Sequence, residues 1–415
     1  MLTSRSPTLF FVAVGLIALH VVDDNFVQPQ PGTSVGDHVF SGLIPLALLA
    51  LAGWAYPRVR PGARATLALV LVIPAILSGV EAIYYAGKGG LSGDDYTGLL
   101  AMAAAPILLV LGVKELWSSR RLDDGLARRY GRRLLKTAGV LVLVALFALP
   151  LSIAYVGSHV TRADVPDANL GAAHENVKLH TSDGLELEGW YVPSKNRAAI
   201  IVFPGRSGTR KQARMLASNG YGVLLYDRRG EGTSEGDPDS WGWDFDKDIR
   251  AGIDFLEHRA DVDPERIGGL GLSVGGEMML QTAADTEALA AVVADGAGAR
   301  TMSEEVYDVS GVEKVGATLS YGARDIANSI LQNRLPPENL KELVPKIAPR
   351  PIFFIHAGAD DAGHLGPKYY RAANEPKQIW EAQGGHTDGI DREPKEYERR
   401  VTAFFDAALN GAHGR

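Results

Sequence analysis

The sequence predicts two structural classes in one chain: an all-helical membrane region, followed by an α/β domain with a mainly parallel sheet flanked by helices. Three observations support this prediction. Five apolar stretches occur before Gly157. After Gly157, short apolar segments alternate with amphipathic ones, which is typical of alternating strands and helices. A serine also lies between two glycines, in Gly271-Leu272-Ser273-Val274-Gly275, where one predicted strand meets the next helix.

Composition limits the function classes. The chain has 415 residues, enough for two or three domains, and a net charge of −7. Residues 1–157 carry 13 Lys and Arg against 9 Asp and Glu, so the acidic excess lies in the second half. A net negative domain argues against nucleic acid as a partner, because binding it requires a basic surface. The chain has no cysteine, which excludes disulfides, thiolate metal sites and a cysteine nucleophile.

The five apolar stretches predict a five-helix transmembrane domain over residues 1–157. A spanning helix needs about 20 mainly apolar residues, and the third and fifth stretches reach that length alone. The first stretch is short. Its alternative is the core of a signal peptide, but no small-x-small cleavage site follows it. The stretches are Leu9–Val22, Val39–Tyr56, Ala65–Ala86, Thr97–Val113 and Thr137–Gly157.

Basic residues alternate between the connecting segments. Residues 1–8, 57–64 and 114–136 hold 1, 3 and 8 Lys or Arg, whereas residues 23–38 hold none and residues 87–96 hold 1. Positively charged loops stay on the cytoplasmic side of a membrane. We therefore expect the amino terminus in the cytoplasm and the second half of the chain outside it.

Several ionisable residues occur at the ends of the apolar stretches predicted to face outside. Charge within a membrane is costly and is often functional, so these residues form a candidate polar site for a cation or another ligand. The alternative is a group of solvated loop carboxylates. The residues are His20, Asp23, His38 and Glu81. We expect no cofactor and no resident metal.

A polar linker over residues 158–173 leads into the α/β domain, which we place at residues 174–415. Strands and helices should alternate along it, with a cap-like helical insertion over the pocket at about residues 301–347. The predicted strands are Val177–His180, Leu185–Val192, Ala198–Phe203, Gly222–Tyr226, Ile267–Leu272, Ala290–Ala294, Pro351–His356 and Gln378–Glu381.

The stretch around Ser273 predicts a nucleophilic serine. A strand, then Gly-x-Ser-x-Gly, then a helix is the arrangement known as a nucleophile elbow. The turn holds the serine in a strained conformation, and side chains at Gly271 and Gly275 would collide with neighbouring backbone. Amide groups and the dipole at the start of the helix favour negative charge beside the hydroxyl. The alternative is a glycine-rich turn whose serine only caps the helix.

A serine hydroxyl needs a general base, and the base needs a carboxylate to orient it. His386 follows the last predicted strand, where a loop can bring it over Ser273, and the order serine, acid, histidine fits an elbow of this kind. His356, inside a strand, and His364, close to the acid loop, are the weaker alternatives.

Three aspartates compete for the role of the acid. Asp361 and Asp360 both follow the strand that ends at His356. Spacing from the preceding glycine favours Asp361, and spacing from His356 favours Asp360. Asp295, at the end of the strand before, is the third candidate.

Backbone amides must hold the oxyanion that forms when the serine attacks. One amide should be that of Val274, directly after the nucleophile. The other should come from the loop Phe-Pro-Gly-Arg-Ser-Gly after the strand Ala198–Phe203, and Arg206 is the residue we expect. The alternative for this loop is a phosphate cradle, but it lacks the Gly-Lys-Ser/Thr ending of such loops.

These residues together resemble the α/β-hydrolase superfamily over about residues 175–409, which implies an α/β-hydrolase fold. The sequence is most similar to the branch of dienelactone hydrolases and prolyl oligopeptidase-like enzymes. Dienelactone hydrolases use a cysteine, which this chain lacks, and the acid loop lacks the usual Val-Pro. A further segment similar to the family motif Asp-x-Arg-Gly-x-Gly-x-Ser should shape the sheet edge without being catalytic. It consists of Asp227, Arg229, Gly230, Gly232 and Ser234.

The sequence thus predicts a membrane-anchored, extracytoplasmic serine hydrolase that cleaves an ester or related acyl bond. Its partners would be a small-molecule or lipid-like acyl substrate and the lipid bilayer, and its oligomeric state is open. One alternative is an acyltransferase or peptidase that uses the same triad on cell-envelope substrates. Another is a non-catalytic membrane sensor with a hydrolase-like binding domain.

Overall fold

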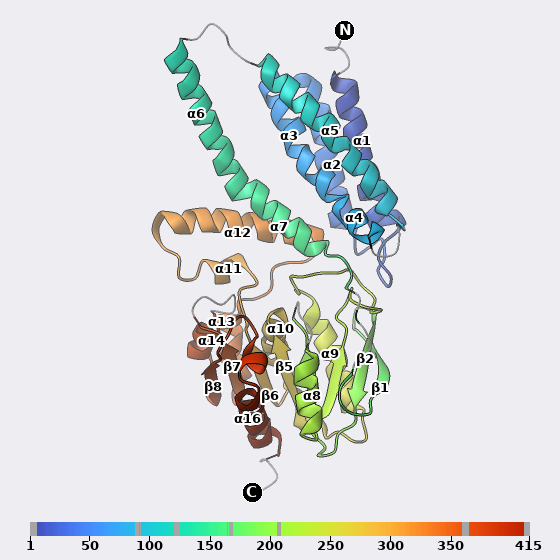
Figure 1. Cartoon of the computed structure of the whole chain (residues 1–415), viewed down its shortest axis with the longest axis vertical. Helices are drawn as coiled ribbons and strands as arrows, with labels where there is room; N and C mark the ends of the chain where they lie inside the picture. The colour runs from blue at the N-terminus through green and yellow to red at the C-terminus, as the bar shows by residue number, and fades with distance from the viewer. Residues whose placement is uncertain are drawn as a thin grey trace. The chain divides into compact units, whose positions relative to one another are not determined.

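The computed structural model describes the chain except residues 1–5, 88–90, 92, 120–124, 164, 166–168, 206–208, 359–364 and 411–415. The chain forms two compact units, and each consists of two separate segments of the sequence (Figure 1). The first contains Met1–Thr161 and Val315–Leu335, and the second contains Arg162–Lys314 and Pro336–Arg415. The backbone therefore passes between the units three times.

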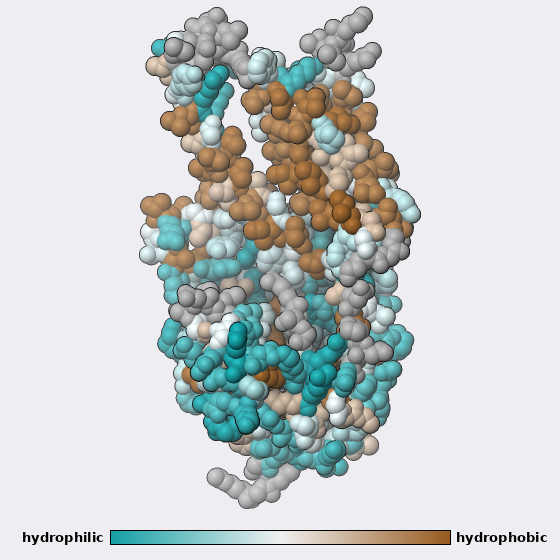
Figure 2. All heavy atoms as spheres, in the orientation of Figure 1, coloured by the Kyte–Doolittle hydropathy of each residue, from teal (hydrophilic) through white to brown (hydrophobic). Residues whose placement is uncertain are grey.

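The first unit is helical, and five of its helical stretches are long and apolar enough to cross a membrane: Ser6–Val27, Val39–Arg58, Pro61–Ala86, Asp95–Ser118 and Tyr130–Ser158. These agree with the five expected from hydropathy. Figure 2 shows hydrophobic residues covering their visible faces. The individual helices are α1 (Ser6–Val22), α2 (Val39–Ala55), α3 (Pro61–Leu77), α4 (Val80–Ala86), α5 (Asp95–Ser118), α6 (Leu126–Leu143) and α7 (Leu149–Ser158).

Small residues let α3 and α5 pack closely. A side chain at Gly98 would lie 2.4 Å from the carbonyl oxygen of Ser78, and one at Gly112 would lie 2.6 Å from Leu69. Ala101 and Ala104 on α5 are fully buried as well. Small residues at helix contacts are typical of membrane bundles. Lipid is as apolar as the side chains, so the helices associate through close van der Waals packing and not through the hydrophobic effect.

The second unit contains one eight-stranded sheet in the order β1-β2-β4-β3-β5-β6-β7-β8. The pairs β1–β2 and β2–β4 are antiparallel, and every later pair is parallel. This confirms the mainly parallel sheet. The strands are β1 (Glu175–His180), β2 (Glu186–Val192), β3 (Ala199–Phe203), β4 (Gly222–Tyr226), β5 (Ile267–Leu272), β6 (Ala291–Asp295), β7 (Ile352–His356) and β8 (Lys377–Glu381).

Both faces of this sheet are covered, as its continuous apolar strands require. In β3, Ala199, Ile201 and Phe203 enter one hydrophobic cluster, while Ile200 and Val202 enter the other. The longer helices in these layers are α8 (Arg210–Ser218), α9 (Phe245–Glu257), α10 (Val274–Asp285), α14 (Gly366–Ala372) and α16 (Pro394–Phe405).

The segment expected as a cap, residues 301–347, contains three α-helices. They are α11 (Met302–Glu305), α12 (Gly311–Leu331) and α13 (Leu340–Leu343). From Val315 onward, α12 groups with the apolar helices of the first unit, although it is inserted between β6 and β7 of the second. Residues 315–335 of this insertion therefore belong to the helical unit, and its two ends belong to the second unit.

Candidate active site

Ser273 lies in the sharp turn between β5 and α10. Its φ of 52° and ψ of −125° place a non-glycine residue in a sparsely populated backbone region. The Ser273 amide donates to the carbonyl oxygen of Asp295 at 2.8 Å, and the amide of Gly276 donates to the Ser273 carbonyl at 2.8 Å. These bonds tie the turn to β6 on one side and to α10 on the other.

The glycines around Ser273 are required by close backbone approach. A side chain at Gly271 would lie 2.2 Å from the carbonyl oxygen of Gly275. One at Gly275 would lie 2.7 Å from the carbonyl oxygens of Phe203 and Pro204. The expected collisions at both positions are present, and this turn has the geometry of a nucleophile elbow.

A cavity of about 300 Å³ opens above this turn, and Ser273, Val274 and His386 all line it. His386 also packs over Gly296, where an added side chain would lie 2.9 Å from its Cε1 atom. The fold therefore brings the predicted nucleophile and the predicted base to one cavity, although they are far apart in the sequence.

Four further polar or aromatic side chains line this cavity that sequence reasoning did not single out: Ser240, Trp241, Glu277 and Arg300. Glu277 lies one helical turn after Ser273 on α10, and its Oε1 accepts from the amide of Gly298 at 2.9 Å. Arg300 is fully buried and donates to Gln281 and to the carbonyl oxygen of Glu338. Only the spacing of Glu277 from Ser273 was visible in the sequence.

An aspartate holds the Ser240–Trp241 segment at the cavity. The carboxylate of Asp239 accepts from the amide of Trp241 at 2.9 Å and from that of Gly242 at 2.7 Å. Burial raises the pKa of Asp239 to about 6, while these two amides lower it. Ser240 and Trp241 are therefore held at the cavity by the Asp239 carboxylate.

The predicted acid and one predicted oxyanion donor fall outside the described residues. Asp360, Asp361 and the alternative base His364 belong to residues 359–364, and Arg206 belongs to residues 206–208. Gly205, next to Arg206, is described: a side chain there would lie 2.6 Å from the carbonyl oxygen of Leu272. Gly205, at the start of the loop after β3, thus lies against the Ser273 turn.

The alternative acid, Asp295, lies at the end of β6 and is 1% exposed. Its Oδ2 accepts from the hydroxyl of Tyr397 on α16 at 2.9 Å. Burial, with this carboxylate beside it, raises the pKa of Tyr397 well above its usual value. The alternative base His356 ends β7 and accepts from the amide of Gly358 at 3.2 Å. Tyr397 is a contact that sequence reasoning missed.

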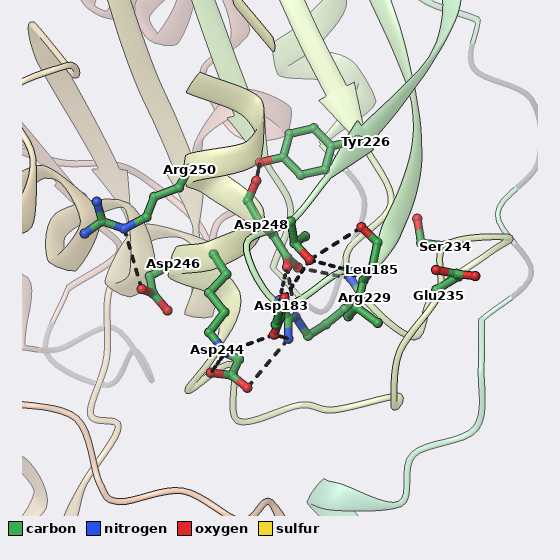
Figure 3. A network of polar contacts seen from close by, with 12 residues as sticks. Asp183, Leu185, Tyr226, Arg229, Ser234, Glu235, Asp244, Asp246, Asp248 and Arg250 are labelled. Carbon is green, nitrogen blue, oxygen red and sulfur yellow. Dashed lines mark hydrogen bonds and ion pairs between the residues drawn. The ribbon is translucent and has the colours of Figure 1, made fainter. Parts of the chain in front are cut away.

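The segment after β4, expected to shape the sheet edge, contains a network of buried charges (Figure 3). Arg229 donates to Asp248 at 2.6 Å and 2.8 Å and to Asp183 at 2.9 Å. The Ser234 hydroxyl donates to the carbonyl oxygen of Asp227 at 2.9 Å. These bonds fix the segment against α9 and the turn between β1 and β2, and none of the five residues lines the 300 Å³ cavity.

The four residues of the candidate polar site lie in the first unit, where His20 and Asp23 share one contact, Thr97. The Thr97 hydroxyl donates to Asp23 at 2.8 Å and lies 3.3 Å from Nδ1 of His20. His38 pairs instead with Thr33 at 3.0 Å, and Glu81 lies half-buried on α4. Within the described part of the chain, no group of three or more His, Asp or Glu side chains is arranged to hold a metal ion.

The chain is similar to one protein family and to several known proteins. Residues 167–343 match the X-Pro dipeptidyl-peptidase (S15) family. The protein YfhR of Escherichia coli K12 is 29% identical over 257 residues, which cover 57% of this chain and 82% of YfhR. The polyketide transferase ATR5 of Stachybotrys chlorohalonatus is 33% identical over 176 residues, which cover 40% of this chain and 56% of ATR5.

Among solved structures, the Pyrococcus furiosus esterase Pf2001 is 20% identical, with a TM-score of 0.49, and the alignment covers 60% of this chain and 98% of the esterase. Three other observations identify the fold of the second unit: the sheet order, the strained turn at Ser273 and the family match. The second unit of this chain has the fold of the α/β-hydrolase superfamily.

Proposed function

We propose that this protein is a membrane-anchored, extracytoplasmic serine hydrolase that cleaves an ester or related acyl bond. One observation carries the proposal: Ser273, held at a φ of 52° by the turn between β5 and α10, shares a cavity with His386. Strain of this kind is found where function requires it, because a residue used only for packing has no reason to retain it.

In the proposed reaction, Oγ of Ser273 attacks the carbonyl carbon of the substrate while His386 accepts the hydroxyl proton. The amides of Val274 and Arg206 hold the negative oxygen of the tetrahedral intermediate. The intermediate collapses to an acyl-enzyme as His386 returns the proton to the leaving group. A water molecule then releases the acid by the same steps, and Asp361 or Asp360 orients His386 throughout.

The proposed location rests on the five candidate spans and their basic loops. Residues 114–136, with eight Lys and Arg, precede the last apolar stretch, Thr137–Gly157, so this loop should stay in the cytoplasm. The second unit would then face the outside. Protease added to intact cells should digest it, and full protection until the cells are lysed would contradict this placement.

A fluorophosphonate probe tests the chemistry, because it reacts with an activated serine. In membranes, the probe should label the wild-type protein and fail to label Ser273→Ala. Ser240→Ala is the matched control, since Ser240 lines the same cavity but lies outside the elbow. Equal labelling of wild type and Ser273→Ala would refute the proposal.

A second candidate is a peptidase or acyltransferase that acts on cell-envelope substrates through the same residues. The S15 match favours a peptidase, and the likeness to ATR5 favours a transferase. Product analysis separates these from an esterase: X-Pro peptides test peptide cleavage, and added alcohols or amines test acyl transfer. Hydrolysis of aryl esters with neither of these activities would favour the first proposal.

A further inference from the structure

The helix α12 buries polar residues and exposes apolar ones. The buried residues of α12 are Arg324, Asp325 and Asn328. Its large exposed side chains are instead aliphatic: Val312 is 89% exposed, Val315 61%, Leu319 45% and Ile326 65%. A helix surrounded by water shows the opposite distribution. The described structure thus presents an apolar surface on α12 that water would disfavour.

The exposed aliphatic residues occupy one side of the helix. Val315, Leu319 and Ile326 are four and seven residues apart, which corresponds to about one and two turns of a helix with 3.6 residues per turn. Val312 extends the same row by one turn at the start. The row is therefore a continuous stripe, which we call the aliphatic stripe of α12.

The polar side of α12 is partly satisfied within the helix itself. Arg324 donates to Asp325 at 3.0 Å and 3.1 Å and lies over the ring of Tyr321. Neither side-chain polar atom of Asn328 has a hydrogen-bond partner in the described structure, although both are buried. The Arg324–Asp325 pair lies on the buried side of α12. The aliphatic stripe lies on the exposed side, so it is the side that can contact an apolar environment.

The position of α12 in the first unit indicates what that environment is. Leu331, at its end, lines a cavity of about 260 Å³ together with His20 and His159. His20 lies near the end of α1, and His159 directly follows α7, so this cavity reaches the ends of these two helices, and it extends to Leu48 and Leu71 within α2 and α3. Figure 1 shows α12 running across the direction of α5. The carboxyl end of α12 therefore lies beside the ends of α1 and α7, and the helix is not aligned with the spans.

We propose that α12 is an interfacial helix whose aliphatic stripe inserts into the lipid surface at the boundary of headgroups and acyl chains. The occupant of the stripe is lipid, as we expect for the exposed aliphatic residues of the candidate spans. Between Gly311 and Leu331 the charged residues are Glu313, Lys314, Arg324 and Asp325, two of each sign. Insertion should therefore depend on apolar burial and not on anionic lipid. This inference rests on the membrane anchoring in the proposed function but not on the catalytic activity.

Because the chain has no cysteine, single cysteines can be labelled without background. The full chain with Leu319→Cys or Ile326→Cys would carry an environment-sensitive fluorophore in phosphatidylcholine vesicles, with or without nitroxide-labelled lipid. Asp254→Cys on α9, with a 74% exposed side chain, is the matched aqueous control. Val110→Cys, 66% exposed on α5, is the control for a spanning helix.

We expect nitroxide lipid to reduce the fluorescence at residues 319 and 326 about twofold, most strongly when the nitroxide is shallow, as for a helix in the interface. Replacing half of the lipid with an anionic one should leave this unchanged. Quenching at residue 110 but not at 319 or 326 would overturn the inference and leave the membrane anchoring intact. The stripe would then be covered by water or by a second protein. Absence of quenching at residue 110 as well would overturn the anchoring itself.

Discussion

Relief of backbone strain at Ser273 should separate stability from activity. Ser273→Ala and Ser273→Gly both remove the hydroxyl, so both should abolish fluorophosphonate labelling. Only glycine adopts a φ of 52° and ψ of −125° without a steric penalty. The two variants should therefore be equally inactive but differ in stability.

The difference can be estimated from the backbone conformation. A non-glycine residue in a sparsely populated region costs about 1–3 kcal/mol. Glycine avoids this cost, but it also makes the unfolded chain more flexible, which lowers the free energy of unfolding by about 0.4–1 kcal/mol. Ser273→Gly should thus be more stable than Ser273→Ala by about 1 kcal/mol, the difference of these two effects.

Urea unfolding of the full chain in mild detergent measures this difference. Four of the six tryptophans, Trp190, Trp241, Trp243 and Trp380, lie in the second unit and report its unfolding. The control is the same pair of substitutions at Ser218, the last residue of α8, where glycine should be less stable than alanine by about 0.5–1 kcal/mol. If Ser273→Gly is no more stable than Ser273→Ala, the turn is not strained and the reasoning fails.

Three other substitutions test the surroundings of the site. Gly271→Ala places a side chain 2.2 Å from the Gly275 carbonyl oxygen and should lower the free energy of unfolding by about 3 kcal/mol, whereas Gly316→Ala, with open space around it, should not lower it. Arg229→Ala leaves the fully buried Asp248 without its cation and should cost about 3–5 kcal/mol in urea unfolding; a loss below 1 kcal/mol would show that the network in Figure 3 is not structural. Burial raises the pKa of Asp227 from 3.8 to about 7, so its ionisation costs the folded state up to about 4 kcal/mol above pH 7 and nothing below about pH 4. Asp227→Asn should therefore gain stability over wild type as the pH rises through this range, and an equal difference at pH 4 and pH 8 would contradict this assignment.

The sequence predicted the local elements well. All eight strands were expected within one or two residues of their observed bounds, because continuous apolar runs such as Ala199–Phe203 are typical of strands buried on both faces. The turn at Ser273 was also predicted, since its two glycines and the flanking strand and helix are neighbours in the chain. Local chemistry was enough for these features.

Contacts between distant segments could not be predicted in the same way. Ser240 and Arg300 reach the cavity through loops whose paths depend on the packed sheet, and Tyr397 meets Asp295 across 102 residues. The grouping of α12 with the apolar helices was missed for a different reason. Its aliphatic residues are spaced like those of a helix that packs on a protein core, so only their exposure identifies the stripe. Arg206, Asp360 and Asp361 stay predictions.

The three passages of the backbone between the units have a practical consequence for making a soluble catalytic fragment. Deleting residues 1–161 would remove the apolar spans but leave residues 315–335 in place. The aliphatic stripe would then lie in water, and aggregation of the fragment would be expected whether or not its sheet folds correctly. A fragment suited to crystallisation should also replace residues 315–335 with a short polar loop joining Lys314 to Pro336.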